Sequence, residues 1–258
     1  MNTLVLLMAQ GDGGRWLDRT PKHLARFNDE PILTRTCRQM EALWPDAEKL
    51  VIGWHYYYPF CKPTPLLTLP EPGPDLCHGI YNSRFLWQKE RIIILLGDVA
   101  YSWALLERIR DDRAQLRVYG RLQPHPLTGK KCDERYAIAF TRLLAGVVEQ
   151  AAQEVIADEE CIPALKSLYH TLIGAPRHYA DRPSLVCWED QILAQVDDYT
   201  DDFDQYQEYK RAKAAIEAAI RKEEQNGRKE ESCEKTLSGV RRDPLSGPPT
   251  RRNHQRQI

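Results

Sequence analysis

Several common signatures of function are missing from this 258-residue chain, and each absence removes a class of protein. The seven cysteines are scattered and form no Cys-x-x-Cys pair, which argues against a zinc site and is typical of a reducing compartment. No apolar run approaches the length of a membrane span. The formal net charge of −1 gives no general case for binding nucleic acid or a membrane surface.

Other absences narrow the possibilities further. No hexapeptide repeat is present, so an attached β-helical domain is not expected. No serine or cysteine nucleophile motif is present either. The early apolar run, Leu4 to Ala9, is short and has no basic leader, so we expect a strand rather than a signal peptide. Together these features predict a cytoplasmic protein with no membrane or nucleic-acid partner.

A glycine-rich turn directly follows this first strand. It contains Gly11, Gly13 and Gly14, which have no Cβ and let backbone N–H groups approach an anion closely. Arg15 and Lys22 add two cations, so the stretch suits a polyphosphate. It lacks the spacing of the P-loop, and Trp16 stands where the dinucleotide fingerprint needs its third glycine. A tight turn without a ligand is the alternative interpretation.

Apolar runs predict further strands after the first one. The strongest is Ile92 to Leu96, whose five consecutive aliphatic residues indicate burial on both faces in a central parallel strand. The remaining expected strands are 49–53, an edge strand at 66–69, 116–121, 135–140 and a short one at 185–188. Expected helices cover 31–43, 75–88, 103–110, 141–156, 162–173 and 205–224. This alternation predicts an α/β domain.

The pair Gly97-Asp98 comes directly after the strongest strand. In an open α/β sheet the carboxyl ends of the strands face the ligand, so this carboxylate is a candidate ligand for Mg²⁺. An N-cap for the helix at 103–110 is the alternative.

A second acidic cluster precedes the last helix. Asp197, Asp198, Asp201, Asp202 and Asp204 fall within eight residues. A solvated loop or an ordinary helix start would also explain them, because carboxylates favour the positive end of the helix dipole.

Four segments follow one another along the chain: the glycine-rich loop, Pro21-Lys22, Gly97-Asp98 and the late acidic cluster. Together, and in this order, they resemble the nucleoside-triphosphate transferase family. These nucleotidyltransferases have a Rossmann-like sheet related to the GT-A glycosyltransferases. The segment from Asp202 to Tyr209 is similar to the family's late Asp-x-Asp-Thr-Pro-Glu-Asp-Tyr segment. It departs from that pattern at Gln205, Tyr206 and Gln207.

The resemblance implies a three-layer α/β/α fold with a mostly parallel mixed central sheet of the nucleotide-diphospho-sugar transferase type. It implies that Arg15 and Lys22 hold the triphosphate while pyrophosphate leaves. It also implies that Mg²⁺ is bound by Asp98 and by Asp204, with Asp202 as the next candidate. The nucleotide-binding positions implied by it are Ala9, Gln10, Gly11, Asp12, Gly13, Gly14, His78 and Gly79.

The implied reaction transfers an NMP from an NTP to a phosphorylated acceptor, such as a sugar phosphate or an alcohol phosphate. Arg121, with Lys130 and Lys131, is a candidate for the acceptor phosphate, and solvated surface charge is the alternative for the two lysines. A GT-A-type glycosyltransferase usually carries Asp-x-Asp after the central strand, but Ala100 occupies the second position here. A nucleotide-binding module without turnover is the other alternative.

Two regions keep simpler interpretations. The aromatic run from Trp54 to Phe60 would either stack on a base or pack an irregular connection into the core. Residues 224–258 are rich in charge and poor in aliphatic residues, so we expect a disordered tail after a domain covering 1–223.

Overall fold

The computed structural model describes residues 1–10, 20–71, 73–130, 133–175, 192–203 and 205–238, with side chains described as far as residue 226. The chain divides into one unit over Met1–Ile220 and a second over Arg221–Ile258. Everything below concerns the first unit unless stated otherwise. In the described part of the chain, no helix has both the length and the apolar character needed to cross a membrane.

A seven-stranded sheet forms the centre of the first unit, in the order β10-β8-β9-β6-β1-β4-β5. Its strands, in that spatial order, are Leu193–Gln195, Leu116–Arg121, Glu134–Thr141, Arg91–Leu96, Thr3–Ala9, Glu48–Gly53 and Leu66–Leu67. β9 pairs antiparallel with both β6 and β8, whereas the other four strand pairs are parallel. The sheet is therefore mixed and mostly parallel, as predicted.

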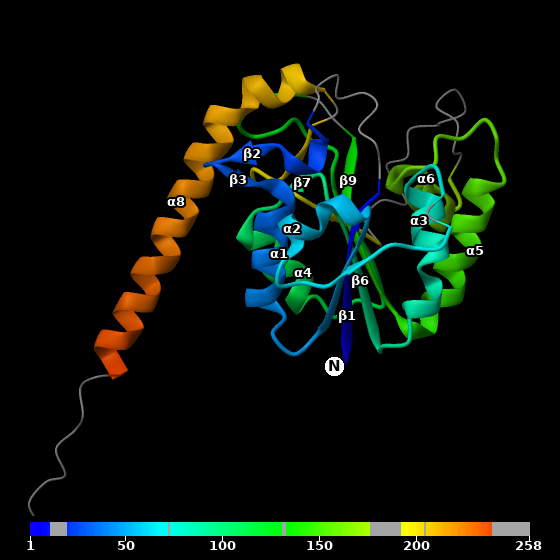
Figure 1. Ribbon diagram of the computed structural model, residues 1–258, viewed down its shortest axis with the longest axis horizontal. Helices are drawn as coiled ribbons and strands as arrows, with labels where there is room; N and C mark the ends of the chain where they lie inside the picture. Colours follow the sequence, from blue (N-terminus) through cyan, green and yellow to red (C-terminus); the bar gives the residue numbers. More distant parts are fainter. Residues whose placement is uncertain (11–19, 72, 131–132, 176–191, 204, 239–258) are drawn as a thin grey trace, which may run out of the picture. The chain divides into compact units, whose positions relative to one another are not determined.

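Helices cover both faces of this sheet, which gives the expected three-layer α/β/α fold (Figure 1). One layer contains α1 (Ile32–Leu43) and α4 (Trp103–Asp111), with the short α2 (Tyr58–Cys61) beside them. The other contains α3 (Leu76–Asn82), α5 (Ala145–Ile156) and α6 (Leu165–Leu172), which pack on one another. Short 3-10 helices join these parts: η1 (Lys22–Leu24), η2 (His55–Tyr57), η3 (Arg84–Leu86) and η4 (Arg142–Leu144).

The core follows from the apolar runs of the sequence. Every residue of β6 is buried, and Leu4 to Leu7 in β1 have no exposed surface. Burial of this kind on both faces requires a continuous aliphatic strand, because a polar side chain there would have to lose its water. The predicted helical stripe of α1 is also buried, including Ile32, Leu33, Met40 and Leu43.

Two small ladders stand outside the main sheet. β2 (Arg26–Phe27) pairs with β3 (Glu30–Pro31), and β7 (Val99–Ala100) pairs antiparallel with β11 (Asp201–Asp202). β11 leads to α8 (Tyr206–Ser238), whose Tyr209, Ala212, Ile216 and Ile220 join a second apolar cluster with Phe27 and Phe203. This cluster anchors the segment that carries the late aspartates.

Several element boundaries differ from the sequence-based expectation. The helix expected at 75–88 ends at Asn82, and the one expected at 141–156 begins at Ala145 after η4. The aromatic run from Trp54 to Phe60 forms η2 and most of α2; Tyr57 is fully buried, whereas Tyr56 and Tyr58 are about half exposed. The expected strand at 185–188 lies outside the described residues.

The last helix is longer than expected. α8 continues to Ser238, past Glu224, because its Glu, Lys and Arg residues are good helix formers. Residues 239–258 lie outside the described residues, and the domain boundary after 223 stays a prediction.

Candidate functional site

The candidate site lies at the carboxyl edge of the central parallel strands. β1 ends at Ala9 and β6 ends at Leu96, immediately before Gly97 and Asp98. Gly97 donates its N–H to the carbonyl of Met8 over 2.8 Å. A Cβ at Gly97 would stand 2.9 Å from that same carbonyl oxygen, so glycine is needed for β6 to pass this close to β1. This close approach fixes the backbone position from which the Asp98 side chain extends.

Lys22 and two carboxylates form the centre of the site. The Lys22 Nζ lies 3.0 Å from Asp98 Oδ2 and also donates to Asp202 Oδ1. Lys22 is 8% exposed, although a lysine ammonium is normally found in water. Its partners come from the end of β6 and from β11, so the ammonium bridges two distant parts of the chain. We call this arrangement the lysine-bridged site.

Charge and burial act together on these three groups. Burial alone would lower the pKa of Lys22, but the charges and hydrogen bonds of Asp98 and Asp202 raise it above its ordinary value. Burial would likewise raise the pKa of Asp98, and the Lys22 ammonium instead holds it below its usual range. For Asp202, burial and then the negative charge of Asp98 raise the pKa well above its ordinary value. The two carboxylates therefore need a cation between them.

The ladder between β7 and β11 brings the late acidic cluster to Asp98. Asp202 is paired with Val99, and Asp201 is paired with Ala100. Because successive side chains of a strand point to opposite faces, only one of these aspartates can face Lys22. That residue is Asp202, the second candidate from the sequence; Asp204, the first candidate, lies outside the described residues.

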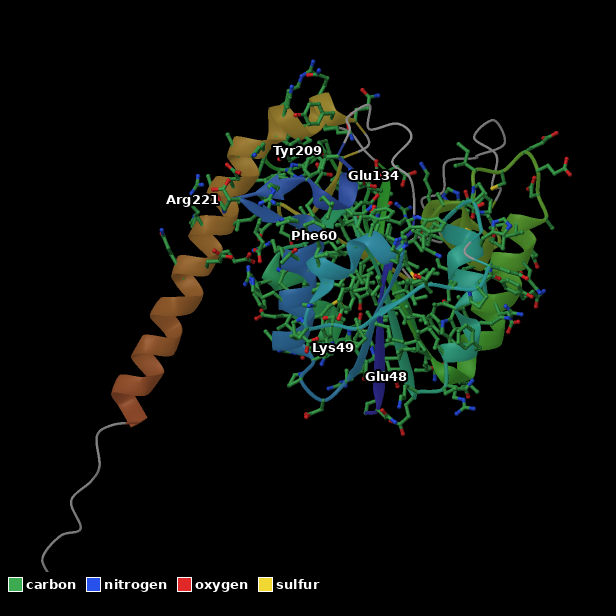
Figure 2. The ribbon with its side chains drawn as sticks, in the orientation of Figure 1. Glu48, Lys49, Phe60, Glu134, Tyr209 and Arg221 are labelled. Atoms are coloured by element: carbon green, nitrogen blue, oxygen red, sulfur yellow. The ribbon has the colours of Figure 1, made fainter. Side chains whose placement is uncertain are left out.

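Glu134 adds negative charge to the same region. It begins β9, which runs against its neighbours, so Glu134 lies at the opposite end of the sheet from Glu48 and Lys49, which begin β4 (Figure 2). After the larger effects of burial, Asp98 and Lys22, its charge also raises the pKa of Asp202. The proximity of Glu134 to Asp202 could not be predicted from the sequence, because the local pattern of a strand does not show which residues of other segments lie near it.

His23 and Tyr57 support the lysine-bridged site from inside the protein. The His23 Nδ1 and the Tyr57 hydroxyl are 3.0 Å apart, and both side chains are buried. Burial lowers the pKa of His23, against the opposing charge of Asp98. A Cβ at Gly97 would also be 3.1 Å from the His23 ring. Sequence reasoning missed His23, which stands in no recognisable motif, and considered Tyr57 only as part of the aromatic run from Trp54 to Phe60.

The predicted nucleotide-binding positions are only partly described. Gly11, Asp12, Gly13, Gly14 and Arg15 lie outside the described residues. Ala9 ends β1 and Gln10 follows it, and the Gln10 Oε1 occupies the space that a Cβ at Gly79 would need. This oxygen is buried and accepts no hydrogen bond among the described residues.

His78 contacts Asp75. Its Nδ1 lies 2.7 Å from Asp75 Oδ2, and Asp75 Oδ1 accepts the backbone N–H of His78 as the N-cap of α3. Nucleotide binding by His78 and Gly79 stays a prediction.

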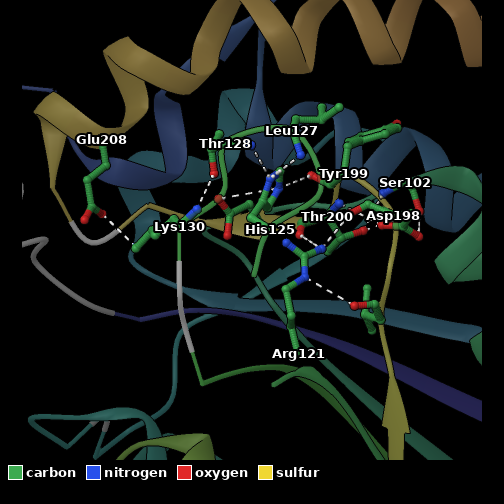
Figure 3. Close-up of polar contacts among 12 residues, drawn as sticks. Ser102, Arg121, His125, Leu127, Thr128, Lys130, Asp198, Tyr199, Thr200 and Glu208 are labelled. Atoms are coloured by element: carbon green, nitrogen blue, oxygen red, sulfur yellow. Dashed lines mark hydrogen bonds and ion pairs between the residues drawn. The ribbon is translucent and has the colours of Figure 1, made fainter. Parts of the chain in front are cut away.

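Arg121 has a structural role that accounts for its burial. It is fully buried and donates to the carbonyls of Val196, Asp198 and Thr200, over 3.2, 2.6 and 2.9 Å (Figure 3). These bonds hold the segment that leads into β11 and so help to position Asp202. Its acceptor-binding role stays a prediction, as does that of Lys130, which pairs with Glu208 over 3.0 Å; Lys131 lies outside the described residues.

Asp198 fixes the same segment from its other side. It accepts the Ser102 hydroxyl over 2.5 Å and the Thr200 N–H over 2.7 Å, and the Thr200 Oγ1 accepts the Ser102 N–H over 3.0 Å (Figure 3). Ser102 is also the N-cap of α4. The N-cap role considered for Asp98 therefore belongs to Ser102.

The donor chemistry of the lysine-bridged site fits a hard divalent cation. Asp98 and Asp202 are oxygen ligands that already converge on one positive group. Among the described residues, no three His, Cys, Asp or Glu side chains gather closely enough to hold a metal ion by themselves. Substrate oxygens would have to complete the coordination, which is usual for Mg²⁺ bound with phosphates.

Comparisons with known proteins find similarity in structure and not in sequence. No protein-family model matches the chain, and no curated protein matches its sequence. A protein from Bacillus anthracis described as a glucose-1-phosphate thymidylyltransferase superposes with a TM-score of 0.55 at 10% identity, covering 83% of this chain and 95% of its own. A UDP-glucose pyrophosphorylase, solved with UDP-glucose, gives 0.55 at 12% identity and covers 84% and 98%.

A third similar structure is the bifunctional IspDF from Campylobacter jejuni. Its TM-score is 0.52 at 11% identity, and the match covers 81% of this chain and 54% of that one. The chain thus has a nucleotidyltransferase-like fold of the nucleotide-diphospho-sugar transferase type, as the sequence motifs predicted.

Proposed function

We propose that this protein is a nucleotidyltransferase, which transfers a nucleoside monophosphate from an NTP to a phosphorylated small molecule. The fold supports this proposal in general terms. The observation that carries it is the convergence of Lys22, Asp98 and Asp202 at the carboxyl edge of the sheet, where open α/β sheets bind ligands. In the sequence, the glycine-rich segment directly follows β1, whose last residue lies at this edge.

In the proposed reaction a phosphate oxygen of the acceptor attacks the α-phosphorus of the NTP. A new P–O bond forms, the bond to the bridging oxygen of the β-phosphate breaks, and pyrophosphate leaves with the electron pair. Reactions of this kind depend on positioning and charge neutralisation, and they need no protein nucleophile. The absence of a nucleophile motif in the sequence agrees with that.

Each charged residue then has a distinct part. Arg15 and Lys22 would neutralise the triphosphate, and Asp98 with Asp202 or Asp204 would hold Mg²⁺. The bound ion would supply further neutralisation of phosphate charge. Lys22 contacts both Asp98 and Asp202, which are two of the carboxylates that would hold the ion. His23 and Tyr57 keep this part of the chain in place from the core side.

The proposal is tested by measuring pyrophosphate release with Mg²⁺. Each of the four NTPs is combined with a panel of sugar 1-phosphates and alcohol phosphates. We expect release that requires one NTP and one acceptor, and a decrease of at least about a hundredfold in Asp98→Asn, similar to the loss of one group that stabilises developing charge. Asp111→Asn is the matched control, because Asp111 is an exposed carboxylate at the end of α4.

Other outcomes point to the two alternatives. NTP binding without release under any acceptor would favour a nucleotide-binding module. Transfer of the sugar from a nucleotide-sugar to an acceptor, with release of the nucleotide, would favour a GT-A-type glycosyltransferase. If no NTP binds, as judged by thermal shift, the nucleotidyltransferase proposal is wrong.

A further inference from the structure

A cavity lies beside β11, between the loop at 125–130 and the first turns of α8. Its volume is about 410 Å³, and it is lined by Leu127, Thr128, Lys130, Asp201, Phe203, Glu208, Arg211, Ala212 and Ala215. Asp201 precedes Asp202 in β11, so the cavity and the lysine-bridged site lie on opposite faces of the same short strand. None of the residues assigned to the lysine-bridged site lines it.

Asp201 is the unusual residue in this wall. Its side chain is 2% exposed, and its Oδ1 is buried without a hydrogen-bond partner among the described residues. Its Oδ2 lies 3.7 Å from the Nε2 of His125. A buried carboxylate oxygen that accepts no hydrogen bond costs free energy, which a donor from a bound molecule would recover.

His125 does not supply a positive charge to balance Asp201 at neutral pH. Its Nδ1 accepts the backbone N–H groups of Leu127 and Thr128, over 3.1 and 3.3 Å (Figure 3). The remaining proton of a neutral ring is then on Nε2, which lies 3.3 Å from the carbonyl of Tyr199. Burial, with the nearby charge of Arg121, lowers the pKa of His125 to about 4, so the ring stays neutral.

The charges around Asp201 favour a neutral donor. The positive charges of Lys130 and Arg121 act on the Asp201 carboxyl group from nearby. Two cations therefore already act on this carboxyl group, and an ammonium group brought next to it would be repelled by both. A hydroxyl group has no such penalty and can donate to either carboxyl oxygen.

Two cations in the wall of the cavity favour an anion. Lys130 is held there by Glu208, at 3.0 Å. Arg211 is exposed on α8 and forms no ion pair within the part of the chain that the structure describes. Phe203, Ala212 and Ala215 supply an apolar wall for a short carbon skeleton.

We propose that this cavity binds a small hydroxylated anion, with its anionic group against Arg211 and Lys130 and a hydroxyl group at Asp201. A polyol phosphate and a hydroxycarboxylate share this chemistry. Both fit within the volume of the cavity, and neither needs the lysine-bridged site. Because Lys22, Asp98 and Asp202 do not line the cavity, it is a ligand site distinct from the lysine-bridged site.

The test is calorimetric titration of the full chain at pH 7 in a buffer without phosphate. The two probes are sn-glycerol 3-phosphate and D-glycerate. Glycerol is the neutral half-ligand control, and inorganic phosphate and acetate are the anionic half-ligand controls for the first and second probe. We expect one probe to bind more tightly than both of its halves. The probe that binds identifies the anionic group.

Variants locate the binding. Arg211→Gln is expected to weaken it about tenfold or more, because an ion-assisted hydrogen bond is lost. Lys210→Gln is the matched control, since Lys210 is an exposed neighbour on α8 that does not line the cavity. Asp201→Asn is expected to reduce the advantage of the probe over its anionic half. Asp98→Asn should leave the titration unchanged.

Three results would overturn the proposal. One is the absence of binding by both probes at about 10 mM, where even a weak site should be detected. Another is equal binding by wild type and Arg211→Gln. The third is loss of binding in Asp98→Asn, which would place the probe at the lysine-bridged site. A failure of pyrophosphate release would leave this titration unaffected, so the two proposals fail independently.

Discussion

Replacing Lys22 by methionine tests the physical account of the lysine-bridged site most directly. The ammonium lies between Asp98 and Asp202, and all three side chains are largely buried. Methionine keeps most of the volume of lysine but carries no charge, so two buried carboxylates would face each other without a cation. We expect the free energy of unfolding at pH 7.5 to fall by about 3–5 kcal/mol, the usual cost of removing one partner of a buried ion pair.

The pH dependence of this loss gives a sharper result. In Lys22→Met the two carboxylates should have raised pKa values in the folded state, because burial and mutual repulsion both favour the protonated form. A carboxyl group with a raised folded pKa makes the protein more stable as the pH falls. The difference between wild type and variant should therefore narrow on going from pH 7.5 to 5.5, by up to about 2.7 kcal/mol for the uptake of one proton.

Urea unfolding, followed by tryptophan fluorescence at the two pH values in the presence of a chelator, measures both effects. Lys89→Met is the matched control, because Lys89 pairs with Glu48 over 3.0 Å at the protein surface. That variant should change the free energy of unfolding by less than about 1 kcal/mol at either pH. A loss below about 1 kcal/mol in Lys22→Met, with the pH dependence of wild type, would refute the reasoning.

Three further predictions concern the framework of the two sites. Gly97→Ala should lower the free energy of unfolding in urea by about 1–3 kcal/mol, because the new Cβ meets the Met8 carbonyl. In the control Gly146→Ala, in α5, the new Cβ meets nothing, so that variant should be neutral or stabilising. Equal effects of the two substitutions would contradict the close approach of β6 to β1. Arg121→Met should lower the free energy of unfolding by about 2–4 kcal/mol, because three buried carbonyls lose their donor. A decrease within about 0.5 kcal/mol, the range for an exposed substitution, would argue against the structural role of Arg121. Asp201→Asn removes a buried carboxyl group whose pKa is about 7 when folded. The free energy of unfolding of this variant, relative to wild type, should therefore increase between pH 4 and 7 by up to about 4 kcal/mol. A difference that does not vary with pH would contradict the raised pKa.

The parts of the fold that depend on local patterns could be predicted from the sequence. The aliphatic run Ile92 to Leu96 indicated a buried central strand, and β6 is that strand. The proline-bounded stretch near Leu66 indicated an edge strand, and β5 lies at the edge of the sheet. Hydrophobic periodicity is a local property, so it survives without knowledge of the rest of the molecule.

Contacts between distant segments could not be predicted in the same way. The β7–β11 ladder involves only two residues from each strand, too few for an alternating pattern to be visible. It nevertheless decides that Asp202 faces Lys22 and that Asp201 faces the other cavity. The buried roles of His23, Tyr57 and Arg121 likewise depend on what other segments bring to them.

The chain separation within the lysine-bridged site also bears on how the protein acquires its site during synthesis. Lys22 and Asp202 are separated by 180 residues, so their contact is among the most distant that this chain makes. Such contacts form late in folding, and a growing chain folds from its N-terminal part first. Lys22 and Asp98 can therefore meet long before the ribosome has added Asp202. A nascent chain stopped before β11 would hold most of the sheet and only part of the site, which makes completion of the site a marker for a fully synthesised domain.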